Sequence, residues 1–573
     1  MKDKRGVKRQ KVNFDLRLSN HVSIISHLFR YFATMKAFGK KQLYILTILA
    51  ALFLSAGWPA RGIPFFLLFG FVPLLIVEEQ LYRDRSNYNA MSFFKYAYLG
   101  MLLWNVLTTW WVCNATIVGG AAAIICNSFF MAMVLVLFHY LRLKTSSKAG
   151  YASLIFFWIT FEYLHLNWQL SWPWLTLGNG FANYAPCVQW YEFTGPLGGS
   201  FWILLSNILI LYIIKYLWLV PLNFPPRWLK QVIVAAAMVV ILPLALSFFL
   251  YFIYTEKNDP VKIVVVQPNI DPYGEKFSED YKVQVSKMLA QTNGYVDSTD
   301  DYLIFPETAL TENIDENRWN ESYSIEALKK YLVQYPRLSI ITGAETFRVY
   351  GQGADIPASA HKIDNSTEYY DDYNSALEVD KSGPVQVYHK SKLVPGVESM
   401  PFQKLLAPIA KLAFDLGGTS GTLGTQKEPS VLISPNTGKK AGVAICYESI
   451  YGEYIGEFVR KGAQLIFIIT NDGWWYNTPG YRQHFCYARL RALETRRCIA
   501  RSANTGISAF INERGDVLQK TDWAVPAVIC AKLNCNNYLS FYAAHGDYIG
   551  RFAEVLSCVM VAFLFLTLIR KQI

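Results

Sequence analysis

Three side chains capable of covalent chemistry stand at the ends of short predicted strands. Glu307, Lys390 and Cys446 each end such a strand. A thiol, a carboxylate and an amine in one site can form and resolve a covalent acyl intermediate, with the thiol as nucleophile. Taken singly, each residue has a plain structural explanation, as buried filler for the cysteine and as solvated charge for the other two. Their shared position after predicted strands favours one common site.

The chemistry of the three groups suggests their roles. A cysteine thiol has a pKa of ~8.5 and is mostly protonated at neutral pH, so Cys446 needs a base. Glu307 is the candidate base, and we expect partial burial to raise its pKa and make it a better proton acceptor. Lys390 would stabilise the thiolate and then the oxyanion of a tetrahedral intermediate. The backbone N–H of Tyr447 could donate to the same oxygen.

The elements that must position these residues follow from the pattern after residue 262, where short β-branched runs alternate with helical stretches. The predicted strands are Lys262–Gln267, Tyr302–Phe305, Leu338–Thr342, Ser375–Val379, Val385–Tyr388, Gly442–Cys446, Leu465–Thr470, Ile499–Ala503 and Ser508–Asn512. The predicted helices are Asp280–Gly294, Ser324–Val333, Ile450–Lys461 and Tyr481–Cys498, and Arg514-Gly515 suits a hairpin turn. This mixture predicts a layered α/β domain in which strand ends converge on one edge of a sheet.

Composition divides the chain into parts. The 573 residues are 53% hydrophobic and 17% charged, which is too apolar for an ordinary soluble protein of this length. Long runs almost free of charge fill 43–255 and 551–569, whereas 256–550 has the charge density of a soluble domain. We therefore expect a basic segment over 1–42, a transmembrane domain of seven spans over 43–255, a catalytic domain over 256–550, and a last transmembrane helix with its tail over 551–573.

The expected membrane part is a bundle of about eight helices, since a bilayer core of roughly 30 Å needs about 20 apolar residues as a helix. The candidate spans are 43–58, 63–81, 93–113, 118–141, 150–167, 200–219, 231–254 and 551–569. Lys and Arg gather in the amino-terminal segment and in the loops at 82–92, 142–149 and 220–230. By the positive-inside rule, both termini lie in the cytoplasm and the catalytic domain lies outside it.

The membrane part also holds polar residues that need an explanation. Glu162 lies inside the fifth expected span, where a carboxylate usually faces the interior of a bundle. The stretch from Trp172 to Gly199 is aromatic but broken by Pro and Gly, and it contains Gln189 and Glu192. It suits an interfacial or re-entrant segment. Two interpretations stay open, an aromatic belt that sets the depth of the protein and a wall of a lipid-entry groove.

Charge and cysteine content exclude several classes of function. The formal net charge of +11 comes largely from the segment before the first span, so it indicates topology more than nucleic-acid binding. The nine cysteines show no metal spacing and form an odd set, and Cys530 and Cys535 are expected to be unpaired. No phosphate-binding glycine loop occurs. We therefore expect no metal, no cofactor and no nucleic-acid partner.

Further short motifs accompany the three candidate residues. They are Val266–Ile270, Lys390–Glu398, Ile445–Glu448, Asn471–Trp475, Gln483-His484, Arg491–Glu494, Asn504–Ile507 and Gly546-Asp547, with Gly57-Trp58-Pro59 and Trp172–Leu175 in the membrane part. Together they resemble the nitrilase (carbon–nitrogen hydrolase) superfamily. Over roughly residues 43–570 the chain looks like the polytopic membrane branch of that superfamily, the apolipoprotein N-acyltransferases. The resemblance implies an αββα-type sandwich inserted before the last span.

The resemblance also implies a reaction. Cys446 would take an acyl chain from a phospholipid, usually phosphatidylethanolamine, as a thioester. It would pass the chain to the α-amino group of the diacylglyceryl-modified cysteine at the amino terminus of an apolipoprotein, a two-step scheme that suits a covalent nucleophile. Glu398 would support Lys390 as a second carboxylate, and Tyr447 and Glu448 would hold the turn at the nucleophile. The implied location is the bacterial inner membrane, with the catalytic domain on the periplasmic side.

Some positions depart from the family pattern. Pro395-Gly396-Val397 stands before Glu398 where the family has Phe-Gly, and Lys392 replaces a common histidine. The stretch Trp475–Gly480 also differs from the usual Trp-Phe-Gly. These departures affect loop shape and the preferred acyl chain or head group, not the reaction class. His484 is interpreted as a structural hydrogen-bonding residue, not as a second base.

The candidate substrate-binding residues lie in two segments. Trp474 and Trp475 belong to the block shared with the family. Phe402 and Leu405 begin an apolar pattern at helical spacing over Pro401–Gly417. This stretch is either an amphipathic lid at the membrane surface or an ordinary helix packed on the domain.

Two other functions remain to be separated. One is a membrane-anchored carbon–nitrogen hydrolase, such as an amidase, which would use the same three residues with water as acceptor. The other is a transporter or scaffold whose outer domain has lost activity, against which the intact Glu307, Lys390 and Cys446 speak. Seven spans before the domain exceed what an anchor needs, which favours a lipid substrate.

Overall fold

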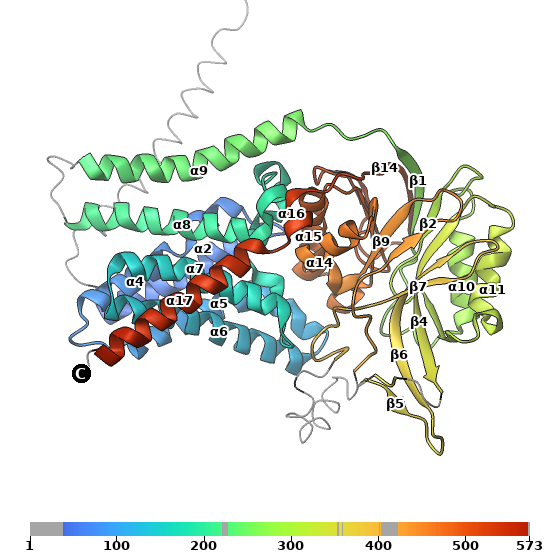
Figure 1. Ribbon diagram of the computed structural model, residues 1–573, viewed down its shortest axis with the longest axis horizontal. Coiled ribbons are helices and arrows are strands. Elements are labelled where there is room, and N and C mark those ends of the chain that lie inside the picture. The colour runs from blue at the N-terminus through green and yellow to red at the C-terminus, as the bar shows by residue number, and fades with distance from the viewer. Residues whose placement is uncertain are drawn as a thin grey trace, which may run out of the picture.

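The computed structural model describes residues 38–219, 227–351, 355–357, 359–399, 402 and 422–570. Long helices gather on one side of the molecule and strands on the other, and α17 returns the chain to the helices after the last strand (Figure 1). The long helices are α2 (Lys40–Ala56), α4 (Val72–Arg83), α5 (Met91–Thr109), α6 (Ile117–Lys144), α7 (Ser147–Asn167), α8 (Tyr191–Leu219), α9 (Arg227–Ile253) and α17 (Tyr548–Arg570).

All eight expected spans fall on helical stretches of the chain. Among the described residues, five helices are long and apolar enough to cross a membrane, and they cover Pro64–Arg83, Ile117–Lys144, Tyr191–Leu217, Trp228–Ile253 and Tyr548–Ile569. The first of these joins the short helices η1 (Pro64–Phe66) and α3 (Leu67–Gly70) to α4. Residues 1–37 of the expected basic segment lie outside the described part.

The strands form two sheets. The first has the order β14-β1-β2-β4-β6-β5, with β3 on β4 and β7 on β6, and the second has the order β13-β12-β11-β10-β9-β8. The strands are β1 (Pro260–Gln267), β2 (Tyr302–Ile304), β3 (Leu310–Asp315), β4 (Ser339–Tyr350), β5 (His361–Lys362), β6 (Tyr369–Val379), β7 (Gln386–His389), β8 (Val431–Ile433), β9 (Lys440–Ile445), β10 (Leu465–Thr470), β11 (Ile499–Ala503), β12 (Ala509–Ile511), β13 (Val517–Lys520) and β14 (Ala527–Asn534).

Alternation along β1 shows how the layers stack. Ile263 and Val265 belong to the core shared with the second sheet, and Tyr302 of β2 packs edge-on against Phe467 of β10, with ring centroids 5.1 Å apart. Val264 and Val266 point the other way and pack with residues of α10 (Tyr281–Gln291) and α11 (Tyr323–Leu332). The second sheet is covered by α14 (Gly452–Arg460) and α15 (Pro479–Thr495). The expected αββα sandwich is therefore confirmed.

Most predicted elements are present, with shifted ends. β4 and β6 are much longer than expected because they pair antiparallel over eleven residues, from Ile340 to Tyr350. The predicted helix over Tyr481–Cys498 stops at Thr495, since Arg496 adopts a left-handed conformation with φ of 50°. The hairpin turn at Arg514-Gly515 is confirmed between the antiparallel strands β12 and β13.

Five strands escaped sequence prediction, and burial explains why. β13 is almost wholly exposed and lies at a sheet edge, so it carries little apolar pattern. β14 contains exposed and polar positions and becomes a strand by pairing with all eight residues of β1. β3, β5 and β8 are short edge or side strands of the same kind. Cys530 and Cys535, on and just after β14, are unpaired as expected.

The expected interfacial stretch joins the helices to the sheets. It forms two 3₁₀ helices, η3 (Pro173–Leu175) and η4 (Leu177–Cys187), whose residues are mostly buried. Arg496 of the sheet part donates to Glu192 Oε2 at 2.7 Å and to Gln189 Oε1 at 2.8 Å, all three side chains being buried. The two polar residues thus have charged partners across this junction, as burial requires.

Glu162 of α7 faces the interior of the helical part, as predicted. Its Oε1 accepts hydrogen bonds from Trp158 Nε1 at 2.9 Å and from the backbone N–H of Leu177 at 2.8 Å. The carboxylate therefore ties α7 to the start of η4.

Candidate active site

Glu307 lies just beyond the buried strand β2, which runs parallel to β1 and β4. Its Oε1 accepts from Asn374 Nδ2 at 2.8 Å and from Lys390 Nζ at 3.1 Å. Its Oε2 accepts from the backbone N–H of Asn471 at 3.0 Å. Both oxygens are thereby held in place, and the side chain is buried.

Lys390 follows β7 and is almost fully buried. Its ammonium group donates to Glu307 Oε1 and, at 2.7 Å, to Glu398 Oε1. Glu398 also accepts from Asn374 Nδ2 at 3.1 Å and from the backbone N–H of Val394 at 2.8 Å. Burial alone would lower the pKa of Lys390, but the charges of Glu307 and Glu398 raise it well above the ordinary value. The buried amine between two carboxylates therefore stays protonated.

Cys446 begins the 3₁₀ helix η7 (Cys446–Ile450) directly after β9. Its φ of 51° is left-handed, a strained conformation for a residue with a side chain. The predicted strand therefore ends one residue early, at Ile445. Such a sharp strand-to-helix turn lifts the side chain out of the sheet. The predicted convergence needs one correction, because Cys446 comes from the second sheet whereas Glu307 and Lys390 come from the first.

Glu448 holds this turn in place. Its Oε2 accepts from the backbone N–H of Ile445 at 2.8 Å. Its Oε1 accepts from Tyr388 OH at 2.6 Å and from the backbone N–H groups of Ser391 at 2.6 Å and Lys392 at 3.2 Å. One buried carboxylate thus fixes the loop that carries the thiol relative to the loop that carries the amine.

The pKa of Glu307 differs from the one expected from the sequence. Burial raises the pKa of Glu307, but the nearby charges of Lys390 and Lys276 outweigh it and the pKa is lowered. The expected raised pKa is therefore wrong. For Cys446, burial and then the negative charge of Glu307 raise the pKa well above its ordinary value. The resting site therefore holds a carboxylate beside a protonated thiol, an arrangement in which a carboxylate can accept the thiol proton.

Lys276 is a buried cation that sequence reasoning missed. Its Nζ donates to the backbone carbonyl of Glu307 at 3.1 Å and to Thr308 Oγ1. Burial lowers the pKa of Lys276 to about 8, partly offset by the charge of Glu307. The residue lies in a loop without helical or strand pattern, so the sequence offered no signal for its position. Asn374 was also missed, because an amide inside a strand gives no sequence signal of its contacts.

His484 is enclosed by hydrogen-bond partners. Its Nδ1 lies 2.8 Å from Asp472 Oδ1, and its Nε2 lies 2.9 Å from Ser449 Oγ and 3.2 Å from the carbonyl oxygen of Cys446. Arg501 donates to the other oxygen of Asp472. Because both ring nitrogens are engaged, the geometry agrees with a structural role.

Tyr447 connects the nucleophile turn to the helical part. Its hydroxyl donates to the carbonyl oxygen of Ser171 at 2.9 Å, and Tyr451 OH donates to Ser171 Oγ at 2.8 Å. These bonds hold the loop before η3 against the turn that begins at Cys446, and Ser171 and Cys446 line the same cavity.

Two cavities meet at the thiol. The sheet-side cavity, of about 620 Å³, holds the polar groups Glu307, Lys390, Glu398 and Asn471. The helix-side chamber, of about 260 Å³, is lined mainly by apolar residues. They include Trp111, Gly119, Gly120, Ala123 and Phe130 of the helices, Trp172 and Trp174 of the broken segment, and Tyr447. Cys446 and Trp475 line both cavities. Of the two interpretations of the broken segment, the geometry favours a cavity wall.

The four candidate substrate-binding residues are placed differently. Trp475 packs against Trp111 at 4.8 Å between ring centroids, at the meeting point of the cavities. Trp474 lines the sheet-side cavity. Phe402 lines neither cavity, is exposed, and donates its backbone N–H to Gln169 Oε1 at 2.6 Å. Leu405 and almost all of the predicted helix over 401–417 lie outside the described residues.

Two family models match long parts of the chain. Residues 50–209 match the family model for the apolipoprotein N-acyltransferase N-terminal domain, and residues 262–540 match the carbon–nitrogen hydrolase model. A solved nitrilase-superfamily structure, Nit3 of Saccharomyces cerevisiae, aligns with 48% of this chain and 90% of its own at 14% identity and a TM-score of 0.34.

Full-length relatives provide the stronger comparison. The apolipoprotein N-acyltransferase of Chlorobaculum tepidum is 30% identical over 524 residues, which cover 88% of this chain and 93% of the relative. That of Geobacter metallireducens is 27% identical over 518 residues, covering 88% and 92%. With two family models and a relative matched over nearly its whole length, this chain belongs to the apolipoprotein N-acyltransferase family and is an acyltransferase enzyme of the membrane.

Proposed function

We propose that the enzyme moves a fatty acyl chain from a phospholipid, usually phosphatidylethanolamine, to the α-amino group of a diacylglyceryl-modified apolipoprotein. The observation that carries this proposal is the position of Cys446 between a polar cavity and an apolar chamber. A lipid substrate has the same two halves. Its acyl chain fits the helix-side chamber while its ester and head group reach the charged groups of the sheet-side cavity.

In the first step, Cys446 Sγ attacks the ester carbonyl carbon and Glu307 takes the thiol proton. Lys390 Nζ uses two of its three hydrogens for Glu307 and Glu398, and the third stabilises the oxyanion together with the Tyr447 backbone N–H. When the ester C–O bond breaks, Glu307 returns the proton to the leaving oxygen. The products are a thioester on Cys446 and a lysophospholipid.

In the second step, the acceptor amine attacks the thioester carbonyl and Glu307 takes a proton from the attacking nitrogen. The C–S bond then breaks, and the same proton goes to the sulfur. The products are an amide and the free thiol, so the enzyme returns to its starting state. Glu398 keeps Lys390 charged, and Glu448 and Tyr447 hold the turn at Cys446 during both steps.

The location proposed for this chemistry is the periplasmic face of the bacterial inner membrane. Supporting it are the helices at the positions of the candidate spans and the Lys and Arg residues that alternate loops carry in the sequence. With eight spans both termini are cytoplasmic. The proposed parts are the basic segment 1–42, seven spans over 43–255, the catalytic domain over 256–550, and the last span with its tail over 551–573.

The test is the intact mass of the purified enzyme after incubation with phosphatidylethanolamine, alongside Cys446→Ala. We expect an acyl-sized increment that hydroxylamine removes and that the variant lacks. Absence of this increment with several phospholipids, while Cys446 still reacts with a thiol probe, would contradict the lipid donor. Release of free fatty acid or ammonia without transfer to an amine would instead indicate a hydrolase that uses water as acceptor.

A further inference from the structure

The helix-side chamber adjoins a second apolar groove within the helical part. The chamber runs from Cys446 along α6 to Phe130 and His165. A second apolar groove of about 770 Å³ starts at the same two residues and continues between α6, α7 and α17, where Met133, Leu137, Leu164 and Val561 line it. We call it the α17 groove. Phe130 and His165 line both spaces, so they form the partition between them.

Aromatic packing holds the residues of this partition together. The ring of Phe130 lies 5.1 Å from that of Trp168 and 6.3 Å from that of His165, edge-on in both cases. Phe161 stacks on His165 at 5.0 Å. Trp168 Nε1 donates to His165 Nδ1 at 2.7 Å, which fixes the orientation of the imidazole. The partition is therefore a packed cluster of four rings, and Phe130 is its member on α6.

The distance from the mouth of the chamber to the partition matches one fatty acyl chain. Gly119 and Phe130 both line the chamber and lie on α6, eleven residues apart. At 1.5 Å per residue, that wall is about 16 Å long. A chain in one leaflet spans half of a core of roughly 30 Å, which is about 15 Å. A chain attached to Cys446 would thus end near Phe130, and a longer one would meet the ring cluster.

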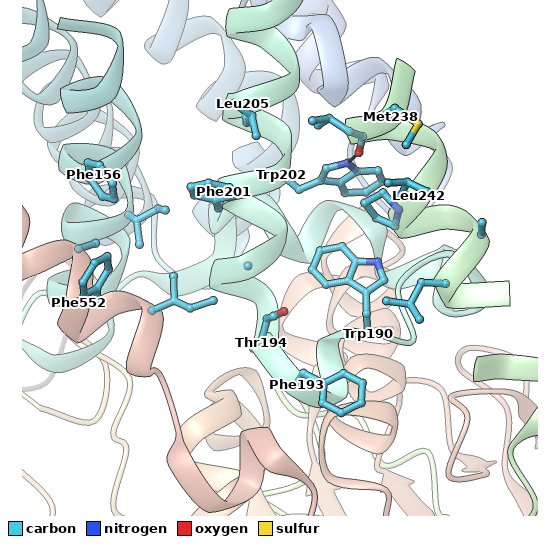
Figure 2. A pocket seen from close by; sticks show the side chains of 18 residues that line it. Phe156, Trp190, Phe193, Thr194, Phe201, Trp202, Leu205, Met238, Leu242 and Phe552 are labelled. Atoms are coloured by element: carbon cyan, nitrogen blue, oxygen red, sulfur yellow. Dashed lines mark hydrogen bonds between the residues drawn. The ribbon is translucent and has the colours of Figure 1, made fainter. Parts of the chain in front are cut away.

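Another apolar groove has no such connection to the thiol. It measures about 980 Å³, lies between α8, α9 and α17, and includes Phe201, Trp202 and Leu242 (Figure 2). Trp202 Nε1 donates to the carbonyl oxygen of Val239 at 2.6 Å, a group that Pro243 cannot bond because proline has no N–H. None of its lining residues lines the helix-side chamber. It therefore provides a control for nonspecific effects of enlarging an apolar groove.

We propose that the Phe130–His165 partition sets the longest acyl chain that the enzyme accepts, and that the α17 groove receives the end of a longer chain once the partition is opened. This inference rests on the proposed acyl transfer through Cys446. It identifies Phe130 as a specificity-determining residue for the length of the donor chain.

The test compares thioester formation on Cys446 from phosphatidylethanolamines of increasing chain length, by intact mass and by rate, in four proteins. They are the wild type, Phe130→Ala, Ala123→Leu and Phe201→Ala. With donor chains longer than the wild-type limit, we expect Phe130→Ala to form the thioester about tenfold faster or more than the wild type does. Each rate is first divided by the same protein's rate with the chain length that the wild type prefers. One methylene in an apolar pocket is worth a factor of that order. Ala123→Leu, which narrows the chamber, shifts the limit to shorter chains. Phe201→Ala leaves the profile unchanged.

The outcomes separate the two proposals. Absence of any thioester in the wild type contradicts the acyl transfer itself. A thioester with the same length profile in wild type, Phe130→Ala and Ala123→Leu overturns the partition. Buried cysteines are labelled slowly in the folded enzyme, so fast labelling would show that Phe130→Ala fails to fold. In that case the direction of the Ala123→Leu shift decides. An equal shift in Phe201→Ala also overturns the proposal, because that groove does not reach Cys446.

Discussion

Glu448 accepts the backbone N–H of Ser391 at 2.6 Å, and this hydrogen bond joins the loop after Lys390 to the turn at Cys446. The other oxygen of the same carboxylate accepts from Ile445, one residue before the thiol. Two sheets contribute to the site, so a bond between their loops decides how far the nucleophile lies from the cation. We therefore propose that Glu448 is a positioning residue, and we expect its loss to reduce the rate without removing any reacting group.

Glu448→Gln tests this role directly. The amide keeps the shape of the side chain but has one acceptor oxygen instead of two, so it places an NH₂ group against a backbone N–H. We expect thioester formation to slow about 100-fold, the usual cost of misplacing a catalytic group by about 1 Å. The free energy of unfolding should fall by about 1–3 kcal/mol, as for an unsatisfied buried group. Single-turnover mass measurements and thermal unfolding check both.

The matched control is Tyr388→Phe, which removes one of the hydrogen bonds to Glu448 Oε1 and leaves the three backbone bonds to the carboxylate intact. Its rate should stay within a few-fold of the wild type. A Glu448→Gln rate as high as that of Tyr388→Phe would show that the carboxylate is not needed to position the turn.

Lys390→Met should remove both activity and stability. It leaves Glu307 and Glu398 as two buried carboxylates without their shared cation, a situation that costs about 3–5 kcal/mol. We expect no detectable thioester and a lowered unfolding temperature. The double variant Lys390→Met/Glu398→Gln removes one charge of each sign and should recover most of the stability but none of the activity. Recovery of activity in the double variant would exclude Lys390 from the chemistry.

Lys276→Met should change the pH dependence of thioester formation. The charge of Lys276 helps to lower the pKa of Glu307, so removing it raises that pKa. Glu307 then becomes protonated at a higher pH, and the acidic limb of the rate profile moves toward higher pH. Above about pH 8 the wild-type Lys276 itself loses its proton, so the two profiles should converge there. Lys262→Met, at a partly exposed ion pair with Asp297, is the control and should leave the profile unchanged.

The reactivity of Cys446 toward a small neutral alkylating reagent gives another pH prediction. Burial and the charge of Glu307 raise the pKa of the thiol, so the thiolate fraction keeps rising tenfold per pH unit above the ordinary range of cysteine. We expect no plateau of the labelling rate near pH 8.5 in the folded enzyme. The same residue in the chain unfolded by denaturant should reach its plateau there. A plateau at the ordinary pH in the folded enzyme would contradict the raised pKa.

Glu307 and Cys446 could be found from the sequence because each follows a buried strand, β2 or β9, and buried strands carry the clearest pattern. Lys390 follows β7, which is short and half-buried, and it was found because it too ends a predicted strand. Lys276 and Asn374 could not be found, because a loop residue and a mid-strand amide show no local feature that distinguishes them from solvated neighbours. The pKa of Glu307 was predicted in the wrong direction for the same reason, since Lys276 was not known to be near it.

By itself, the sequence determined which residues are candidates to react. It also determined that the chain combines apolar helices with a layered α/β part, and which family the chain resembles. These properties depend on residue type and on periodicity, which are local. Only the tertiary structure decided that two sheets share the site and that two cations lower the pKa of Glu307. It also decided that an apolar chamber, lined in part by α6, reaches the thiol of Cys446. These properties depend on distances between segments far apart in the chain, and such distances are set by packing that no local pattern records.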